Sequence, residues 1–226
     1  NSRSAIDYLL SAAQGFIIIM IFLSVVFVGI YEGLQTHVIE KVEKKYFYPY
    51  PYEEVIDKYA RQYNVDNSLV AGIILAESRF SPEAKSHRGA IGLMQIMPET
   101  GAWIANNIND QGYNENKLYD PETNIHYGVW YLSFLMKEFG NNEILTVAAY
   151  NAGHGQIEEW SKLYGWRKNG FYDYTQIPFK ETRDYVHRVF DNKKSYQKLY
   201  DKINLGIFHS KSSISNKTYL PKLWEI

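Results

Sequence analysis

One carboxylate in the sequence stands where a carboxylate is costly to bury. Glu77 follows Val70 by seven residues and Ile74 by three, so a helix through this segment places its side chain on the apolar face. Burial raises the pKa of a carboxyl group, and an acid with a pKa near neutrality can donate a proton to a glycosidic oxygen. In the structural alternative, Glu77 caps a loop or pairs with Arg79 or Arg88, and its position alone does not decide between the two.

A segment rich in turn-forming residues follows Glu77. Gly89 and Gly92 allow tight backbone turns close to a ligand. The residues that come next, Met94, Gln95 and Met97, carry amide and thioether groups, and Pro98 then begins a new helix. Two further motifs occur later in the chain, Ala-Tyr-Asn-Ala-Gly at 149–153 and Ile-Pro-Phe-Lys-Glu-Thr-Arg-Asp-Tyr-Val at 177–186.

In these motifs and in their order, the chain resembles the lytic transglycosylases of the soluble type, over roughly residues 52–200. The resemblance implies an all-α, lysozyme-like helical domain with a substrate cleft between two lobes. It also implies that Glu77 is the catalytic acid and base. By this resemblance, further residues line the substrate cleft, namely Ser86, Gln95, Met97, Tyr150, Asn151 and Glu181.

The implied reaction is non-hydrolytic cleavage of peptidoglycan glycan strands. Glu77 protonates the β-1,4 oxygen between N-acetylmuramic acid and N-acetylglucosamine, and then removes the proton of the C6 hydroxyl so that a 1,6-anhydro ring closes. Most glycosidases use two carboxylates, and here the 2-acetamido group of the substrate replaces the second one. No metal or cofactor is expected.

Each cleft residue also has an ordinary structural explanation. Ser86 can cap a turn, Met97 can fill a core, and Glu181 can be an acid favoured at a helix N-terminus. Tyr150 and Asn151 can form a helix C-terminus before a glycine. Their joint occurrence, in this order, favours the substrate cleft.

Two other functions stay open at this point. A goose-type muramidase would share the fold and use water, which requires a carboxylate to activate that water. A catalytically inert glycan-binding component of an envelope-spanning machine would have no need of a buried acid. Mass spectrometry distinguishes the first, because anhydro products are lighter by one water.

Composition argues against other classes of protein. The 24 basic and 25 acidic side chains form no basic cluster, so nucleic acid is not an expected partner. The absence of cysteine excludes thiolate catalysis and cysteine metal sites, and the histidines form no His-Glu-x-x-His motif.

The elements that position these residues are predicted to be helical. Beyond residue 52, apolar residues recur at helical spacing and few runs alternate with period two. Asp66, Asn67 and Ser68 are candidate N-caps of the helix that carries Glu77. The periodicity predicts helices over residues 55–63, 69–77, 128–139, 143–150, 155–163 and 181–200.

The N-terminal segment reads as a membrane anchor. No charged residue lies between Asp7 and Glu32, and about 20 apolar residues suffice to cross a hydrocarbon layer of about 30 Å. No small-residue cleavage site follows, so we expect an uncleaved transmembrane helix rather than a signal peptide. The expected organisation is a membrane anchor at 1–34, a stalk at 35–51, a catalytic domain at 52–202 and a tail of unassigned role at 203–226.

Charge and function give opposite predictions for the orientation of the anchor. Arg3 precedes the apolar segment, whereas Lys41, Lys44 and Lys45 follow it, and a count of basic residues alone would place the following domain in the cytoplasm. A peptidoglycan substrate requires the opposite. We therefore expect a single-pass protein of the bacterial cell membrane with its catalytic domain on the extracytoplasmic side.

Overall fold

The computed structural model describes residues 2–166 and 173–201, and these residues form an all-α structure, as predicted. Within them there is no β-strand, and the only β-type pairings are two isolated bridges, between Lys85 and Ile91 and between Ile91 and Ile96. The chain forms two compact units, divided between Phe47 and Tyr48. The predicted tail at 203–226 lies outside the described residues.

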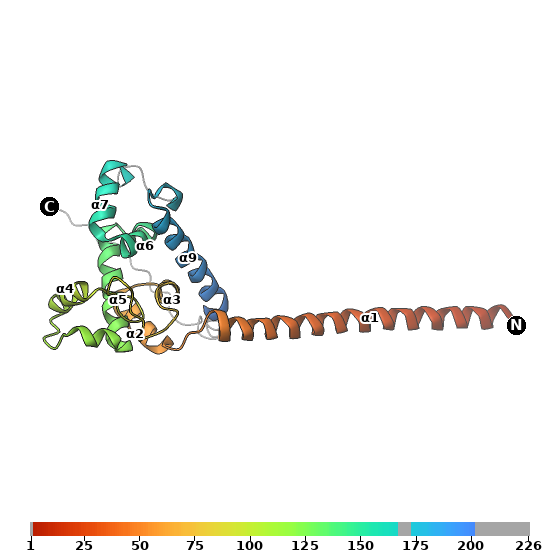
Figure 1. Cartoon of the computed structure of the whole chain (residues 1–226). Helices are drawn as coiled ribbons and strands as arrows, with labels where there is room; N and C mark the ends of the chain where they lie inside the picture. The colour runs from red at the N-terminus through yellow and green to blue at the C-terminus, as the bar shows by residue number, and fades with distance from the viewer. Residues whose placement is uncertain (1, 167–172, 202–226) are drawn as a thin grey trace, which may run out of the picture. The chain divides into compact units, whose positions relative to one another are not determined.

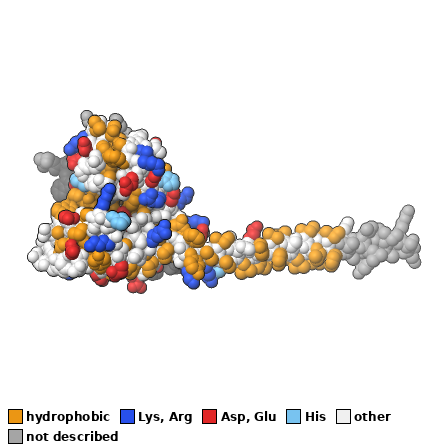
Figure 2. Space-filling model, in the orientation of Figure 1, with side chains coloured by type: hydrophobic (Ala, Val, Ile, Leu, Met, Phe, Trp, Pro, Cys, Tyr) orange, Lys and Arg blue, Asp and Glu red, His pale blue; other side chains and the backbone are white. Residues whose placement is uncertain are grey.

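The first unit is essentially one helix. Helix α1 spans Ser2–Val42 and continues into a π-helical turn at Glu43–Phe47. Its apolar side chains, from Phe16 onwards, are exposed along the helix, as Figure 2 shows. The stretch Gln14–Phe47 is long and apolar enough to cross a membrane, which confirms the predicted long apolar helix near the N-terminus.

The second unit contains the remaining helices (Figure 1). They are α2 (Glu53–Tyr63), α3 (Asn67–Glu77), α4 (Pro98–Ile108), α5 (Pro121–Glu138), α6 (Glu143–Ala152), α7 (His154–Leu163) and α9 (Lys180–Tyr196), with shorter 3-10 or π-helical turns at Glu115–Tyr119, Tyr174–Gln176 and Gln197–Asp201. Every helix predicted from periodicity is present in this unit.

Two helix boundaries differ from the predicted ones by about a helical turn or more. Helix α5 begins at Pro121 rather than near residue 128, because the Asp120 side chain accepts a hydrogen bond from the Thr123 amide and proline suits the first helical position. The regular part of α9 ends at Tyr196, and the chain then widens into the π-helical turn instead of continuing as α-helix to residue 200.

Helix α3 is the central helix of the second unit. Every residue from Ser68 to Ile74 is buried, so the predicted apolar stripe is part of a helix that is covered on all sides. Helix α9 packs closely against it at Gly72, where a Cβ atom would lie 3.0 Å from the backbone of Val189 and Lys193. This close packing holds the C-terminal end of α3, and therefore Glu77, against α9.

Candidate active site

Glu77 is the last residue of α3 and is half-buried. The Tyr185 hydroxyl, which comes from α9 and is 108 residues away in the chain, donates a hydrogen bond of 2.6 Å to Glu77 Oε1. Tyr185 itself is only 3% exposed. Directly after Glu77, the Ser78 hydroxyl donates to the Leu93 carbonyl at 2.7 Å, which ties the end of α3 to the following loop.

Burial dominates the electrostatics of this carboxyl group. It raises the pKa of Glu77 to about 7, while the Tyr185 hydrogen bond and the positive charge of Arg188 act in the opposite direction. Near neutral pH the group is therefore populated both as an acid and as a carboxylate. A group in this state can donate a proton in one step and accept one in the next.

The alternative role for Glu77, an ion pair with Arg79 or Arg88, does not fit this geometry. Arg79 and Arg88 are both exposed, and within residues 2–166 and 173–201 Glu77 takes part in no ion pair. Its direct partner is the neutral phenol of Tyr185. The carboxyl group is thus largely shielded from water and has no compensating cation in contact.

The loop between α3 and α4 is a compact, hydrogen-bonded turn. The Ser86 hydroxyl accepts a hydrogen bond of 3.0 Å from the Ala90 amide. Gln95 has a left-handed backbone conformation (φ 49°), and its Nε2 donates to the carbonyls of Ala84 (3.1 Å) and Gly92 (2.9 Å). Two of the predicted cleft residues therefore also brace the loop that carries them.

Asn124, on α5, anchors this loop and was not anticipated from the sequence. Its side chain is fully buried, accepts a hydrogen bond from the Met94 amide (2.8 Å) and donates to the carbonyls of Ile91 (2.9 Å) and Leu118 (2.7 Å). Gly92 (φ 79°) lies against it, and a Cβ atom at Gly92 would clash with the amide. The available signal was an asparagine four residues before Gly128, on the face of an otherwise apolar helix stripe.

Tyr150, on α6, links this loop to the surroundings of Glu77. Its hydroxyl donates a hydrogen bond of 2.8 Å to the Met94 carbonyl. Burial, together with the negative charge of Glu77, raises the pKa of Tyr150 well above its usual value, so this side chain stays a neutral phenol. Asn151 follows it and is half-buried near the end of α6.

Helix α9 contributes one face to the site. Glu181, in the first turn, is exposed, and Tyr185 and Arg188 follow at four and seven residues, so the three share a helix face. The α9 side chain that contacts Glu77 is Tyr185. Tyr185 was placed in an apolar stripe by the sequence, and spacing within α9 gives no sign of a carboxyl partner on α3.

The structure thus groups the predicted residues around three segments. Glu77 and Tyr150 lie within electrostatic range of each other, and Tyr150 contacts the loop that holds Ser86 and Gln95. Met97 is the N-cap of α4 at the end of that loop and is half-buried. Among the described residues, no group of three or more histidine, aspartate or glutamate side chains is placed to hold a metal ion.

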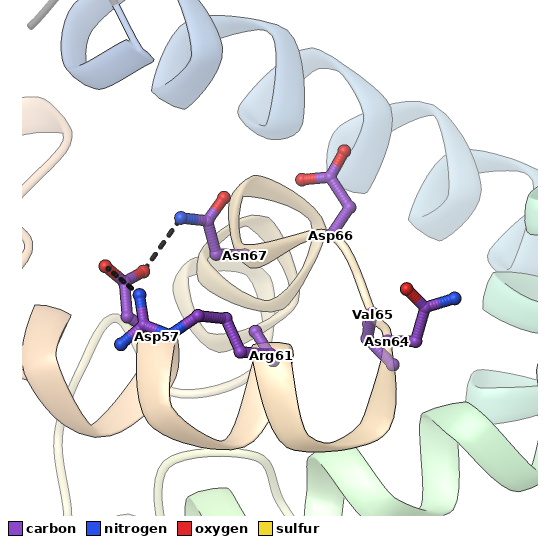
Figure 3. Close-up of a pocket in the computed structure, with 7 residues that line it drawn as sticks. Asp57, Arg61, Asn64, Val65, Asp66 and Asn67 are labelled. Atoms are coloured by element: carbon purple, nitrogen blue, oxygen red, sulfur yellow. Dashed lines mark hydrogen bonds and ion pairs between the residues drawn. The ribbon is translucent and has the colours of Figure 1, made fainter. Parts of the chain in front are cut away.

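A separate cavity of about 550 Å³ lies at the turn between α2 and α3, and none of the predicted cleft residues lines it (Figure 3). Four of its polar side chains make contacts with one another or with the helix end. Asp57 accepts a hydrogen bond of 2.8 Å from Asn67 and lies 3.7 Å from Arg61, while Asp66 caps α3. These contacts account for the cavity as a feature of the turn.

Comparison with known proteins places these residues in a family. The model of the transglycosylase SLT domain matches residues 54–170. The soluble lytic murein transglycosylase of Escherichia coli K12 is 38% identical over 143 residues, which are 63% of this chain and 22% of that protein. The membrane-bound lytic murein transglycosylase C of Haemophilus influenzae PittEE is 36% identical over 115 residues, 47% of this chain and 32% of that protein.

Solved structures show the same relationship. The 70 kDa soluble lytic transglycosylase of E. coli has a TM-score of 0.63 and 36% identity, covering 70% of this chain and 25% of that one. An inactive glutamate-to-glutamine mutant of the lytic transglycosylase Slt from Pseudomonas aeruginosa has a TM-score of 0.61 and 29% identity, covering 72% and 27%. These matches confirm the predicted lysozyme-like fold, although the chain spans less than a third of the relatives' length. The chain belongs to the transglycosylase SLT domain family.

Proposed function

We propose that this protein is a membrane-bound lytic transglycosylase that cleaves the glycan strands of peptidoglycan, with Glu77 as its acid and base. The observation that carries the proposal is the half-buried Glu77 carboxyl group, whose pKa of about 7 results from burial and whose partner is the Tyr185 phenol. Family membership and relatives named lytic murein transglycosylases support the same activity.

In the first step, protonated Glu77 gives its proton to the β-1,4 oxygen between N-acetylmuramic acid and N-acetylglucosamine. The C1–O bond breaks, and the positive charge that develops at C1 is stabilised by the 2-acetamido group of the same sugar. In the second step, the Glu77 carboxylate takes the proton of the C6 hydroxyl while O6 bonds to C1. The 1,6-anhydro ring closes, Glu77 is protonated again, and no water is consumed.

The neighbours of Glu77 suit the two steps differently. The Tyr185 hydroxyl donates to the carboxylate form, and so stabilises the state that must collect the C6 proton. Burial favours the protonated form, which must begin the reaction. The balance of these two effects leaves both forms accessible near neutral pH.

The predicted cleft residues keep the role of substrate contacts in this proposal. Each of them is at least partly exposed, as contact with a glycan requires, and they are Ser86, Gln95, Met97, Tyr150, Asn151 and Glu181. Ser86, Gln95 and Met97 belong to the loop and the N-terminus of α4, so they would contact the strand as one rigid surface.

A muramidase reaction is less well supported by the surroundings of Glu77. Hydrolysis needs a second carboxylate within roughly 5–10 Å to activate water or form a covalent intermediate. Over the part of the chain that the structure describes, the pKa of Glu77 is shifted by burial, by the Tyr185 hydrogen bond and by the Arg188 charge. None of these causes is a neighbouring carboxylate.

We further propose the extracytoplasmic side of the cell membrane as the location of residues 52–202, with residues 1–34 as a single-pass anchor and 35–51 as a stalk. The apolar helix of the first unit supports membrane association, as does the relative named membrane-bound lytic murein transglycosylase C. The side follows from the substrate, because peptidoglycan lies outside the cytoplasmic membrane.

The test uses the full chain in detergent micelles with purified sacculi as substrate. Mass spectrometry of the released fragments should show 1,6-anhydro ends, lighter by one water than hydrolysed ends. Glu77→Gln should release anhydro fragments at a rate at least roughly a thousandfold lower, and it should unfold at a temperature no lower than that of the parent. Reducing ends from the parent protein would replace this proposal with the muramidase, and turnover by Glu77→Gln at the rate of the parent would remove Glu77 from the mechanism.

A further inference from the structure

The short segment at residues 48–50 is bound to the C-terminal end of α9 and to the π-helical turn that follows it. The Tyr196 hydroxyl donates a hydrogen bond of 2.7 Å to the Pro49 carbonyl, across 147 residues of chain. The Tyr200 hydroxyl donates one of 2.7 Å to the Tyr48 carbonyl, across 152 residues. The segment is therefore fixed to the second compact unit, which begins at Tyr48.

Tyrosine rings pack around these two hydrogen bonds. We call Tyr48, Tyr50, Tyr196 and Tyr200 together the tyrosine clasp. The Tyr196 ring, on a residue that is 1% exposed, lies 5.8 Å from the ring of Tyr48 and 5.5 Å from that of Tyr50. The Tyr200 ring lies 5.7 Å from Tyr196 and 5.1 Å from Tyr50. Aromatic pairs at these separations stabilise each other beyond the area that they bury, so the clasp is a packed contact.

The tyrosine clasp reaches the end of α3 that carries Glu77 through one further ring. Phe80, three residues after Glu77, is 7% exposed, and its ring lies 6.3 Å from that of Tyr196. Tyr185 precedes Tyr196 by 11 residues, which is about three helical turns, so the two tyrosines share one face of α9. This face therefore contacts the end of α3 and the following turn twice, at the Glu77 carboxyl group and at the Phe80 ring.

The turn between Glu77 and Phe80 has a backbone conformation that side-chain-bearing residues rarely adopt. Arg79 (φ 52°) and Phe80 (φ 62°) both lie in the left-handed region, and neither is glycine. Such a conformation costs free energy and persists where the surrounding structure enforces it. Because Arg79 is exposed, the packing that stabilises this part of the turn comes from the buried Phe80 ring.

We propose that the tyrosine clasp is a positioning device for Glu77. Residues 48–50, held on Tyr196, keep Phe80 packed in its strained turn, and this turn keeps the Glu77 carboxyl group in its largely buried place. The inference rests on the proposed function, since it takes Glu77 as the proton donor. Release of the segment from α9 then slows cleavage without changing its products. Activity is thereby tied to the chain segment that directly follows the first unit.

The test compares Tyr50→Ala with the parent, each as the full chain in detergent micelles with sacculi as substrate. The variant removes the ring contacts of Tyr50 with Tyr196 and Tyr200. We expect kcat to fall by about tenfold with KM unchanged, because a small displacement of a catalytic group suffices for such a loss. The alkaline fall of the rate, expected at about pH 7 in the parent, should move to lower pH, since a less buried carboxyl group has a lower pKa.

The shift of the pH profile reports the surroundings of Glu77 itself. In the part of the chain that the structure describes, the titratable and charged side chains coupled to Glu77 are Tyr185 and Arg188 of α9 and Tyr150 of α6. Tyr50→Ala replaces none of them. A residue that served only to stabilise the fold would lower the unfolding temperature and leave both kcat and the pH profile in place.

Two variants serve as controls. Tyr50→Phe keeps the ring and should restore the rate and the pH profile of the parent, because the proposal assigns the effect to ring packing. Tyr63→Ala is the matched control, since it removes another half-buried tyrosine, one that stacks on His126 at 5.7 Å and is hydrogen-bonded to it at 2.6 Å. It should lower the unfolding temperature and leave kcat and the pH profile unchanged. All rates are measured below the unfolding temperature of the least stable variant.

A second readout does not depend on activity. Hydrogen exchange followed by mass spectrometry reports on the turn after α3, where the Ser78 amide donates to the Ile74 carbonyl (3.0 Å) and the Ser81 amide to the Ser78 carbonyl (3.1 Å). Exchange in this turn should be faster in Tyr50→Ala than in the parent, and unchanged in Tyr63→Ala.

The proposal is overturned if Tyr50→Ala keeps the parent's exchange in the turn, or keeps the parent's kcat and pH profile. Equal effects in Tyr63→Ala would also overturn it, since they would indicate a general loosening of the fold. If Tyr50→Ala does not fold, Tyr48→Ala removes a single ring contact with Tyr196 and should change both readouts in the same direction by less. Parent behaviour of a folded Tyr48→Ala would then overturn the clasp. A parent protein that releases no anhydro fragments would instead contradict the proposed function, whatever the exchange of the turn.

Discussion

The two ends of helix α3 each carry a carboxylate, and the two are treated in opposite ways. At the N-terminal end, Asp66 accepts hydrogen bonds from the amides of Ser68 (2.8 Å) and Leu69 (3.2 Å), and Lys193 lies 3.1 Å away. At the C-terminal end, the Glu77 carboxyl group is largely buried, has no cation in direct contact among the described residues, and has the Tyr185 phenol as its partner.

The helix itself adds to this difference. Its dipole favours a negative charge at the N-terminus and disfavours one at the C-terminus. Asp66 therefore stabilises the fold as an anion, whereas the folded protein favours the protonated form of Glu77. One helix shows how the same functional group serves structure at one end and, in our proposal, proton transfer at the other.

The largest expected effect comes from removing the proton donor. Glu77→Gln should lower the rate of sacculus cleavage by roughly a thousandfold or more, because general acid–base catalysis alone contributes about 10²–10⁴-fold and Glu77 acts in both steps. The measurement is release of anhydro fragments by mass spectrometry at a fixed time and protein concentration.

The same variant, which loses activity, should gain thermal stability, and the size of this gain depends on pH. The folded-state pKa of Glu77, about 7, lies above its ordinary value of 4.5, so the stability associated with its protonated form is present below pH 4.5 and is lost as pH rises through 7. Glu77→Gln, neutral throughout, should unfold at the parent's temperature at pH 4 and at a higher temperature at pH 8. A variant less stable than the parent at pH 8 would contradict the burial of this charge.

The next effect in size belongs to the other end of the helix. Asp66→Ala should lower the free energy of unfolding by about 1–2 kcal/mol, because it removes an N-cap and a partly buried partner of Lys193. Chemical denaturation measures the change. Cleavage of sacculi by the protein that stays folded should be unaffected.

Asp66→Asn is the matched control, since it keeps a side-chain oxygen for the Ser68 and Leu69 amides and loses only the charge facing Lys193. Its loss of stability should be smaller than that of Asp66→Ala. If both variants lose cleavage activity without unfolding, the division of α3 into a structural and a chemical end is wrong.

The sequence was sufficient for the parts of this comparison that depend on local pattern. Helical periodicity predicted α3, and Asp66, its N-cap, was one of the three candidate N-caps; the three motifs led to the fold family. Gly92, expected at a tight turn, has the left-handed backbone conformation that such a turn uses.

What could not be predicted depends on contacts between distant segments. Tyr185 reaches Glu77 across 108 residues, and Asn124 reaches Met94 across 30, and both residues read as part of a helix stripe. Periodicity says that a face is turned inward, but not which atom it meets there.

The smallest expected effect refines the role of Tyr185. Its hydrogen bond to Glu77 Oε1 favours the carboxylate and lowers the Glu77 pKa, so Tyr185→Phe should raise that pKa above about 7. Cleavage requires protonated Glu77 at the start, and in the parent the rate should therefore fall as pH rises through about 7. In Tyr185→Phe this alkaline fall should move to higher pH, by less than about one unit for one neutral donor. The rate at acidic pH should drop modestly, because the carboxylate that collects the C6 proton has lost its donor.

The pH dependence of the initial rate measures both changes. Tyr196→Phe, which removes a buried hydroxyl bonded to the Pro49 carbonyl, is the control that should leave the pH profile unchanged. A shift of the alkaline fall to lower pH would show that Tyr185 acts on Glu77 in some way other than as a donor to its charged form.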